Sequence, residues 1–124
     1  MRQHSSREEL LNPTEHARKA VDVASERQAS DILLLDVRKV VNFADFFVIM
    51  SAESQRQMDA LADELEGEMK KAGALLHHRE GTTSSGWILL DFGDVILHVF
   101  ATGTREFYRL ENLWAKAMTV VRLQ

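Results

Sequence analysis

The stretch that decides the fold reads GWILLDFGDVILHVF and occupies residues 86–100. The apolar run before Gly93 has Asp91 as its one polar side chain, and the run after Asp94 has only His98. Short apolar runs bounded by turn residues predict β-strands. The Gly-Asp pair between them predicts a tight type II′ hairpin, because glycine takes a positive φ at the first turn position without steric cost.

This turn also predicts the register of the two strands. Phe92 is expected opposite Val95, and the pairing continues outward until Trp87 meets Phe100. Directly opposed residues share a face of the sheet, so the hairpin has one wholly apolar face and one mixed face. The apolar face, which we expect in the core, comprises Ile88, Leu90, Phe92, Val95, Leu97 and Val99. The mixed face comprises Trp87, Leu89, Asp91, Ile96, His98 and Phe100.

Two interpretations of the mixed face remain open from the residues alone. In the first, the chain's own helices cover it, and Asp91 and His98 lie near its rim with hydrogen bonds to the backbone. In the second, part of it contacts another protein, because tryptophan is over-represented among interface anchors and Trp87 lies in an apolar patch with a polar edge.

Capping and periodicity predict two helices before this hairpin. Asn12, followed by proline, starts the first, which has small apolar residues at helical spacing and is expected to end near Gln28. Ser54 opens the second with a capping box, and Gly73 is placed where a left-handed C-terminal cap is needed.

Composition predicts the remaining strands. Residues 32–37 and the latter half of residues 43–50 are short apolar runs typical of buried strands. Residues 74–78 are predicted as an edge strand, followed by a polar, flexible connection at residues 79–85. Residues 119–123 form either a short strand or a trailing segment.

A last helix is predicted after the hairpin, with Thr104 as its N-cap and its end near Ala117. Its buried stripe comprises Phe107, Leu110, Leu113, Trp114 and Ala117. Residues 12–124 are therefore predicted as a single α/β (α+β) domain, with a mixed sheet of about five strands and three main helices. Residues 1–11 are expected to be a flexible tail.

Composition also excludes several classes of protein. The chain has no cysteine, which excludes disulfides and Cys-ligated zinc. A net charge of -4 and a pI near 5.7 disfavour direct sequence-specific nucleic-acid binding. No apolar run approaches the ~18 to 20 residues of a membrane span. The N-terminal region does not resemble a transit peptide, because it is acidic and has no apolar segment.

The chain lacks the common catalytic patterns, namely a Gly-rich phosphate loop, a GxSxG elbow and an HExxH motif. Asp36 and Asp45 could pair around a metal, but aspartates at strand ends are more often turn residues. His77 and His78 are adjacent and point to opposite faces of a strand, which disfavours one shared metal ion. We therefore expect no catalytic, cofactor-binding or metal-binding residue.

Several segments in order closely resemble the ribosomal silencing factor RsfS family, also called Iojap-like proteins. They are ASDILLLDV at residues 29–37, ADFFVIMSAESQRQMDALADELE at residues 44–66, REG before Trp87, the hairpin itself, and REFYRLENLW at residues 105–114. The resemblance covers about residues 17–117.

The resemblance implies a nucleotidyltransferase-like fold without the catalytic motif of those enzymes. It further implies that the protein binds the large ribosomal subunit through its protein numbered fourteen, and so blocks association with the small subunit and represses translation under nutrient limitation. Some family members are dimers, so a homodimer is implied as well. Family members also occur in mitochondria and chloroplasts, so the resemblance, together with the absent transit peptide, implies a bacterial cytoplasmic protein. Two alternatives remain, a nucleotide-handling enzyme on the same scaffold and a homodimeric adaptor with another protein partner.

The family's partner-facing surface is associated with the strand that begins at the tryptophan and with the turn after it. On this sequence the resemblance therefore nominates Trp87, Ile88, Leu89, Asp91 and Asp94. The hairpin register agrees with this set except for Ile88, which it assigns to the apolar face. Trp87 and Leu89 would be apolar anchors, and Asp91 or Asp94 would pair with a Lys or Arg. Tyr108 and Glu111 of the last helix are further candidates.

Overall fold

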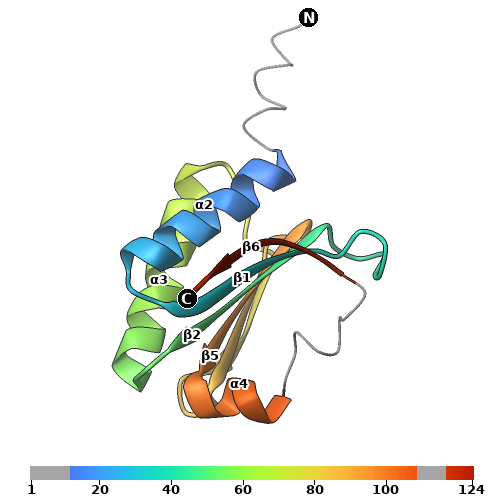
Figure 1. The fold of residues 1–124 in the computed structure, drawn as a ribbon. Helices are drawn as coiled ribbons and strands as arrows, with labels where there is room; N and C mark the ends of the chain where they lie inside the picture. Colours follow the sequence, from blue (N-terminus) through green and yellow to red (C-terminus); the bar gives the residue numbers. More distant parts are fainter. Residues whose placement is uncertain (1–11, 109–116) are drawn as a thin grey trace, which may run out of the picture.

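A six-stranded mixed β-sheet forms the middle of the molecule, and helices pack against it (Figure 1). The computed structural model describes residues 12–108 and 117–124. In these ranges the strands are β1 (Ser30–Asp36), β2 (Phe46–Ala52), β3 (His78–Thr82), β4 (Trp87–Asp91), β5 (Val95–Ala101) and β6 (Met118–Leu123). The helices are α2 (Pro13–Glu26), α3 (Gln55–Lys71) and α4 (Thr102–Tyr108).

The strands follow the order β3-β4-β5-β2-β1-β6 across the sheet. Neighbouring strands are antiparallel except for β2 and β5, which are parallel. A parallel pair needs a long crossover connection, and here α3 and the strands β3 and β4 supply it. The predicted mixed sheet, parallel where a helix crosses over, is confirmed.

The predicted β4–β5 hairpin is confirmed in its register and in the position of its turn. Gly93 has a φ of 86°, and the Phe92 N–H donates to the Val95 carbonyl over 2.9 Å. Pairing then continues from Asp91 opposite Ile96 to Trp87 opposite Phe100, as the turn required. The two hairpin faces therefore have the compositions derived from the sequence.

Helices α2 and α3 lie together on one face of the sheet (Figure 1). Both begin at the predicted N-caps: the Asn12 side chain accepts the Thr14 N–H over 2.8 Å, and the Ser54 hydroxyl accepts the Gln57 N–H over 3.1 Å. The small residues of α2 are fully buried against their neighbours, namely Ala17, Ala20 and Ala24. The core under these helices contains the whole predicted apolar face, Ile88, Leu90, Phe92, Val95, Leu97 and Val99.

The predicted edge strand at residues 74–78 is wrong, because β3 spans His78–Thr82. The position of β3 is set by its pairing with β4 and not by an apolar composition. Arg79, on the helix side, also holds this polar strand in place through a 2.9 Å ion pair with Glu66 of α3. Leu75, in the segment expected to be a strand, is instead a loop residue with 73% of its surface exposed.

Strand β6 makes the sheet one strand larger than the five that were expected. It pairs antiparallel with β1 and forms the edge of the sheet on that side. The interior position of β1 accounts for its continuous apolar sequence, because both of its faces and both of its edges are covered. The segment that the sequence left open between a strand and a trailing end is therefore a strand.

Helix α4 begins at Thr102, directly after β5, and not at a Thr104 N-cap. Thr104 has a packing role instead, since a Cβ added to Gly86 would lie 2.2 Å from the Thr104 hydroxyl oxygen. Most of the predicted stripe, namely Leu110, Leu113 and Trp114, lies outside the described residues, as does the side chain of Phe107. Ala117 is described and is a partly buried residue directly before β6. Within the described residues, no helix is long and apolar enough to cross a membrane.

Candidate functional site

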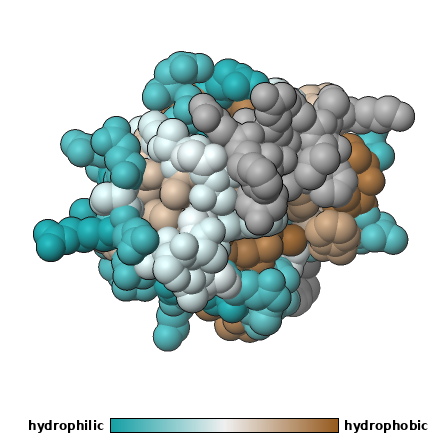
Figure 2. Space-filling model, turned by 90° about the horizontal axis from the view of Figure 1, so that it is seen from below, coloured by the Kyte–Doolittle hydropathy of each residue, from teal (hydrophilic) through white to brown (hydrophobic). Residues whose placement is uncertain are grey.

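The sheet face opposite α2 and α3 carries a second apolar cluster, which we call the aromatic face. Strand β4 contributes two partly buried residues to it, Trp87 and Leu89. Strands β1, β2 and β5 contribute the buried residues Leu33, Leu35, Phe47, Ile49, Ile96, His98 and Phe100. Seen from the side on which α4 lies, hydrophobic atoms reach the surface between hydrophilic rims (Figure 2). Helix α4 packs at one end of this face, where the Arg105 guanidinium donates to the Ser51 hydroxyl over 2.9 Å and to the Asp31 carbonyl.

Trp87 is held on the aromatic face by stacking and by a hydrogen bond. Its ring lies over Phe100 with centroids 4.9 Å apart and an angle of 28° between the planes. Its indole N–H donates to Nδ1 of His98 over 3.3 Å. The indole is only half-buried, so it presents an aromatic surface of fixed orientation at the edge of the cluster.

His98 lies in the interior of this face rather than at its rim. Its side chain is 4% exposed, and its ring meets Phe47 edge-on at 5.0 Å. The sequence suggested that the imidazole of His98 would bond to the backbone at the rim of the sheet. Because the ring lies in the interior of the face instead, its Nδ1 accepts the hydrogen bond from the Trp87 indole. Burial lowers the pKa of His98 to about 3, so the imidazole is neutral near pH 7.

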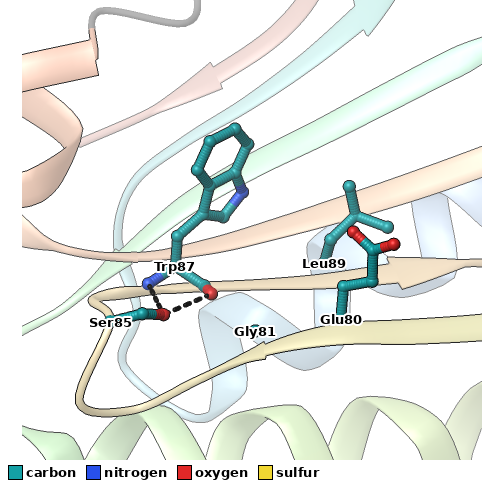
Figure 3. A pocket seen from close by; sticks show the side chains of 5 residues that line it. All are labelled: Glu80, Gly81, Ser85, Trp87 and Leu89. Carbon is teal, nitrogen blue, oxygen red and sulfur yellow. Dashed lines mark hydrogen bonds between the residues drawn. The ribbon is translucent and has the colours of Figure 1, made fainter.

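A pocket of about 240 Å³ lies beside the exposed edge of Trp87 (Figure 3). Its lining residues come from β3, β4 and the turn between them, namely Glu80, Gly81, Ser85, Trp87 and Leu89. Glu80 lies opposite Leu89 in the register, and both side chains rise from the sheet on the side of the indole. The Ser85 hydroxyl donates a hydrogen bond to the Trp87 carbonyl over 3.1 Å, which connects the turn to β4.

Sequence reasoning missed Glu80 and Ser85 because it treated residues 79–85 as a flexible connection. The observation that could have identified Glu80 is that its segment pairs with β4 as a strand. Once β3 is aligned with β4, its alternate residues His78, Glu80 and Thr82 share the face of Trp87 and Leu89.

Carboxylates gather at the other end of the aromatic face. Asp91 accepts the Gly93 N–H over 2.7 Å and so supports the turn, while Asp94 at the turn is exposed. The Asp94 carbonyl accepts the backbone N–H of Asp45 over 2.7 Å. Burial, and secondly the negative charge of Asp94, raise the pKa of Asp45. Near these acids lies Phe43, an apolar side chain that is 58% exposed.

Asp36, one of the two aspartates considered as a metal-binding pair, already has a cationic partner. Asp36 is engaged by Arg38 through a 2.6 Å ion pair, and the hydrogen bond from that guanidinium lowers the pKa of Asp36. In the described ranges no group of three or more His, Cys, Asp or Glu side chains is arranged to hold a metal ion.

The fold separates the nominated residues into three groups. Trp87, Leu89 and Asp91 share the aromatic face, and Asp94 lies at the turn that ends it. Ile88 lies on the opposite face with 0% exposure, as the register indicated and against the nomination by resemblance. Tyr108 ends α4, but its side chain and the whole of Glu111 lie outside the described residues.

These features define a small mixed α/β domain with α2 and α3 on one sheet face and, on the other, an aromatic cluster with α4 at one end. The family model described as "Ribosomal silencing factor during starvation" matches residues 11–124. The chain therefore belongs to the ribosomal silencing factor family.

Individual relatives agree with this assignment. Ribosomal silencing factor RsfS of Halalkalibacterium halodurans is 36% identical over 101 residues, which cover 82% of this chain and 86% of the relative. A protein of Mus musculus named mitochondrial assembly of ribosomal large subunit protein 1 is 30% identical over 97 residues, covering 76% of this chain and 42% of that protein.

A solved structure shares the fold. The crystal structure of a Chromobacterium violaceum protein has a TM-score of 0.80 and 31% sequence identity, and the match covers 84% of this chain and 87% of that one. The bacterial relatives are named as silencing factors, which describes regulation and not an enzymatic reaction.

Proposed function

We propose that this protein represses translation by binding the large ribosomal subunit through its protein numbered fourteen and blocking association with the small subunit. In this proposal the protein acts in the bacterial cytoplasm by occupying a surface. It catalyses no reaction and needs no cofactor or metal. The aromatic face is the part of the molecule that contacts the subunit.

The observation that carries the proposal is the position of Trp87 and Leu89. Both are partly exposed apolar side chains on an otherwise buried sheet face, and the Trp87 ring stacks on Phe100 and donates a hydrogen bond to His98. Interface hot spots are typically aromatic anchors that lose little conformational entropy on binding, surrounded by a rim that excludes water. Trp87 and Leu89 have the chemistry of such an anchor.

The charge of the surrounding rim supports a basic partner. Glu80 lies beside the anchor, and Asp91 and Asp94 lie at the far end of the same face. The whole chain has a net charge of -4. Proteins that bind ribosomal RNA carry Lys and Arg to neutralise its phosphates, so an acidic rim is complementary to them and would steer association.

The names of relatives support the choice of the large subunit. The family is described by ribosome silencing, and the mouse relative is named for assembly of a large ribosomal subunit. Blocking by occupancy requires only that the bound domain fills space needed by the small subunit, which a small folded domain can do without chemistry.

The test is co-sedimentation of the purified protein with isolated large subunits, combined with a subunit-joining assay. Wild-type protein is expected to bind and to reduce joining. Trp87→Ala should weaken binding by about 2 kcal/mol or more, roughly thirtyfold. Circular dichroism establishes that each variant is folded.

Leu75→Ala is the matched control, because Leu75 is an exposed apolar residue on the α3 side of the molecule, beside Asp63 and Lys70. It should bind as wild type does. Binding without loss of joining would refute the blocking mechanism, and a folded Trp87→Ala variant with unchanged affinity would refute the assigned face.

A homodimer through the same face is a second proposal, and it makes a distinct prediction. Light scattering would show a dimer that Trp87→Ala converts to a monomer, and large subunits would compete with dimer formation because both use the aromatic face. A dimer that persists in Trp87→Ala and binds subunits would show that the two surfaces differ.

A further inference from the structure

We propose that His98 is a positioning residue, whose Nδ1 fixes the orientation in which Trp87 is presented to the binding partner. The inference rests on the proposed function, because it concerns the same aromatic face. It adds a residue that is itself buried and makes no direct contact with the partner.

Stacking alone leaves the orientation of the indole open. The contact with Phe100, at 4.9 Å and 28°, restricts the plane of the Trp87 ring. A rotation of about half a turn about χ2 would keep a similar plane on Phe100, since this torsion has a broad, roughly two-fold profile. The 3.3 Å bond from Nε1 to His98 Nδ1 selects one of these orientations, because only one directs the N–H at the imidazole.

The protonation state of His98 suits this role. Because Nδ1 accepts a hydrogen bond, the proton of the neutral ring is on Nε2. The low pKa caused by burial keeps the ring neutral at the pH of a cell, so Nδ1 remains an acceptor. A protonated ring would have two donors and could not accept the indole N–H.

Stability alone does not account for an imidazole at this position. Nε2 of His98 is buried and has no hydrogen-bond partner among the described residues. A buried, unsatisfied donor destabilises a fold, so an apolar side chain of similar size would serve the core at least as well. The requirement for an acceptor facing Trp87 does account for the imidazole.

The test separates the acceptor of His98 from its volume. His98→Phe keeps a ring between Phe47 and Phe100 but removes the acceptor, and His98→Leu serves the same purpose if the larger ring does not fit. His98→Asn removes the ring but places an amide oxygen near the position of Nδ1, so it keeps an acceptor.

The variants are then expected to rank in one order by stability and in the opposite order by affinity for the large subunit. The apolar variants should melt at or above the temperature of wild type, yet bind large subunits roughly three- to tenfold more weakly, the range expected for one hydrogen bond. His98→Asn should be less stable because it leaves a cavity, yet bind more tightly than the apolar variants. If affinity follows stability across these variants, His98 is merely structural and the proposal fails.

A mutant cycle ties the effect to the indole N–H. In a Trp87→Phe background, which has no such donor, His98→Phe should change affinity less than twofold. An undiminished effect of His98→Phe in that background would show that His98 acts by another route and would overturn the proposal.

Nuclear magnetic resonance tests the orientation without any ribosome. The indole signal of Trp87, assigned by its loss in Trp87→Phe, should be single in wild type and exchange slowly with solvent. In the apolar His98 variants it should shift or double and exchange faster. Failure of wild type to bind subunits would refute the proposed function, but the indole signal would still decide whether His98 orients Trp87. An unchanged indole signal in His98→Phe would refute the positioning role.

Discussion

The backbone N–H of Asp45 donates to the carbonyl oxygen of Asp94 over 2.7 Å, which fastens the start of β2 to the start of its parallel neighbour β5. The same contact brings two carboxyl groups together at the acidic end of the aromatic face. Burial and the charge of Asp94 both raise the pKa of Asp45, so the ionised Asp45 carboxylate opposes folding.

Asp45→Asn is therefore expected to stabilise the protein at neutral pH. The folded-state pKa of Asp45 lies above its unfolded value, so the folded state binds the proton more strongly, and stability falls as pH rises through that pKa. The gain in melting temperature should be present at pH 7 and should shrink towards pH 3. Asp94→Asn removes only the repulsion and should gain less. A melting temperature at pH 7 that is unchanged or lower in Asp45→Asn would contradict this account.

Ile88 and Leu89 should respond to truncation in opposite ways. Ile88 is 0% exposed in the helix-side core, so Ile88→Ala should cost roughly 2 to 5 kcal/mol of unfolding free energy. Leu89 is partly exposed, so Leu89→Ala should cost less stability but weaken subunit binding. Urea unfolding and co-sedimentation of the folded proteins check this pair. If folded Ile88→Ala bound subunits more weakly and Leu89→Ala bound them as wild type does, the assignment of Ile88 to the core and of Leu89 to the binding face would be wrong.

Charge reversal at Asp94 should slow association with the large subunit. Asp94→Lys replaces an exposed acid of the rim, while its backbone contact to Asp45 remains possible. Asp59→Lys makes the same charge change on the exposed surface of α3, on the other side of the sheet. Stopped-flow association rates at low salt should fall for Asp94→Lys only. The difference in rate between Asp94→Lys and wild type should vanish near 1 M salt, because salt screens the interaction between separated charges. Equal slowing by both variants would show that only net charge matters.

Two glycines should respond oppositely to alanine. A Cβ on Gly67, within α3, would have nothing within 4 Å, so Gly67→Ala should stabilise by up to about 1 kcal/mol through helix propensity. Gly86 has a φ of 80°, and its Cβ would lie 2.2 Å from the Thr104 hydroxyl, so Gly86→Ala should destabilise by more than about 1 kcal/mol. Urea midpoints measure both changes. A stable Gly86→Ala variant would mean that the turn before β4 relaxes freely.

His98 should make the stability of the protein depend on pH below neutrality. Burial lowers its folded-state pKa to about 3 from an ordinary value of 6.5. Between these values the unfolded state binds more protons, so stability is lost as pH falls, by at most about 1.4 kcal/mol per pH unit. His98→Leu lacks this loss, so unfolding free energies measured from pH 7 to pH 4 should show wild type declining more steeply. Parallel curves would contradict the burial of a neutral imidazole.

The features of this fold that local sequence predicted correctly depend on neighbours along the chain. The Gly93 turn sets which residues of β4 and β5 are opposed, and the alternation of side chains then assigns Ile88 and Leu89 to opposite faces. The starts of α2 and α3 were predictable for the same reason, since Asn12 and Ser54 bond to backbone N–H groups two and three residues away.

The features that local sequence missed or left open depend on partners distant along the chain. β3 has a polar sequence and is a strand because β4 supplies its hydrogen bonds and α3 pairs with Arg79. β6 is a strand because β1 has a free edge for it. The pocket residue Glu80 was missed together with β3, because the register of that strand decides on which face of the sheet the Glu80 side chain lies. Ser85 was missed because it lies in the turn that follows β3.

The sequence by itself determined the hairpin, its two faces, the N-caps of α2 and α3 and the family, because each is carried by residue types at short, fixed spacings. Only the tertiary structure decided that His98 is buried against Trp87 rather than bonded at the rim. Register places both residues on one face, but the packing of Phe47 and Phe100 around the imidazole removes it from water and leaves the indole N–H as the donor that Nδ1 meets.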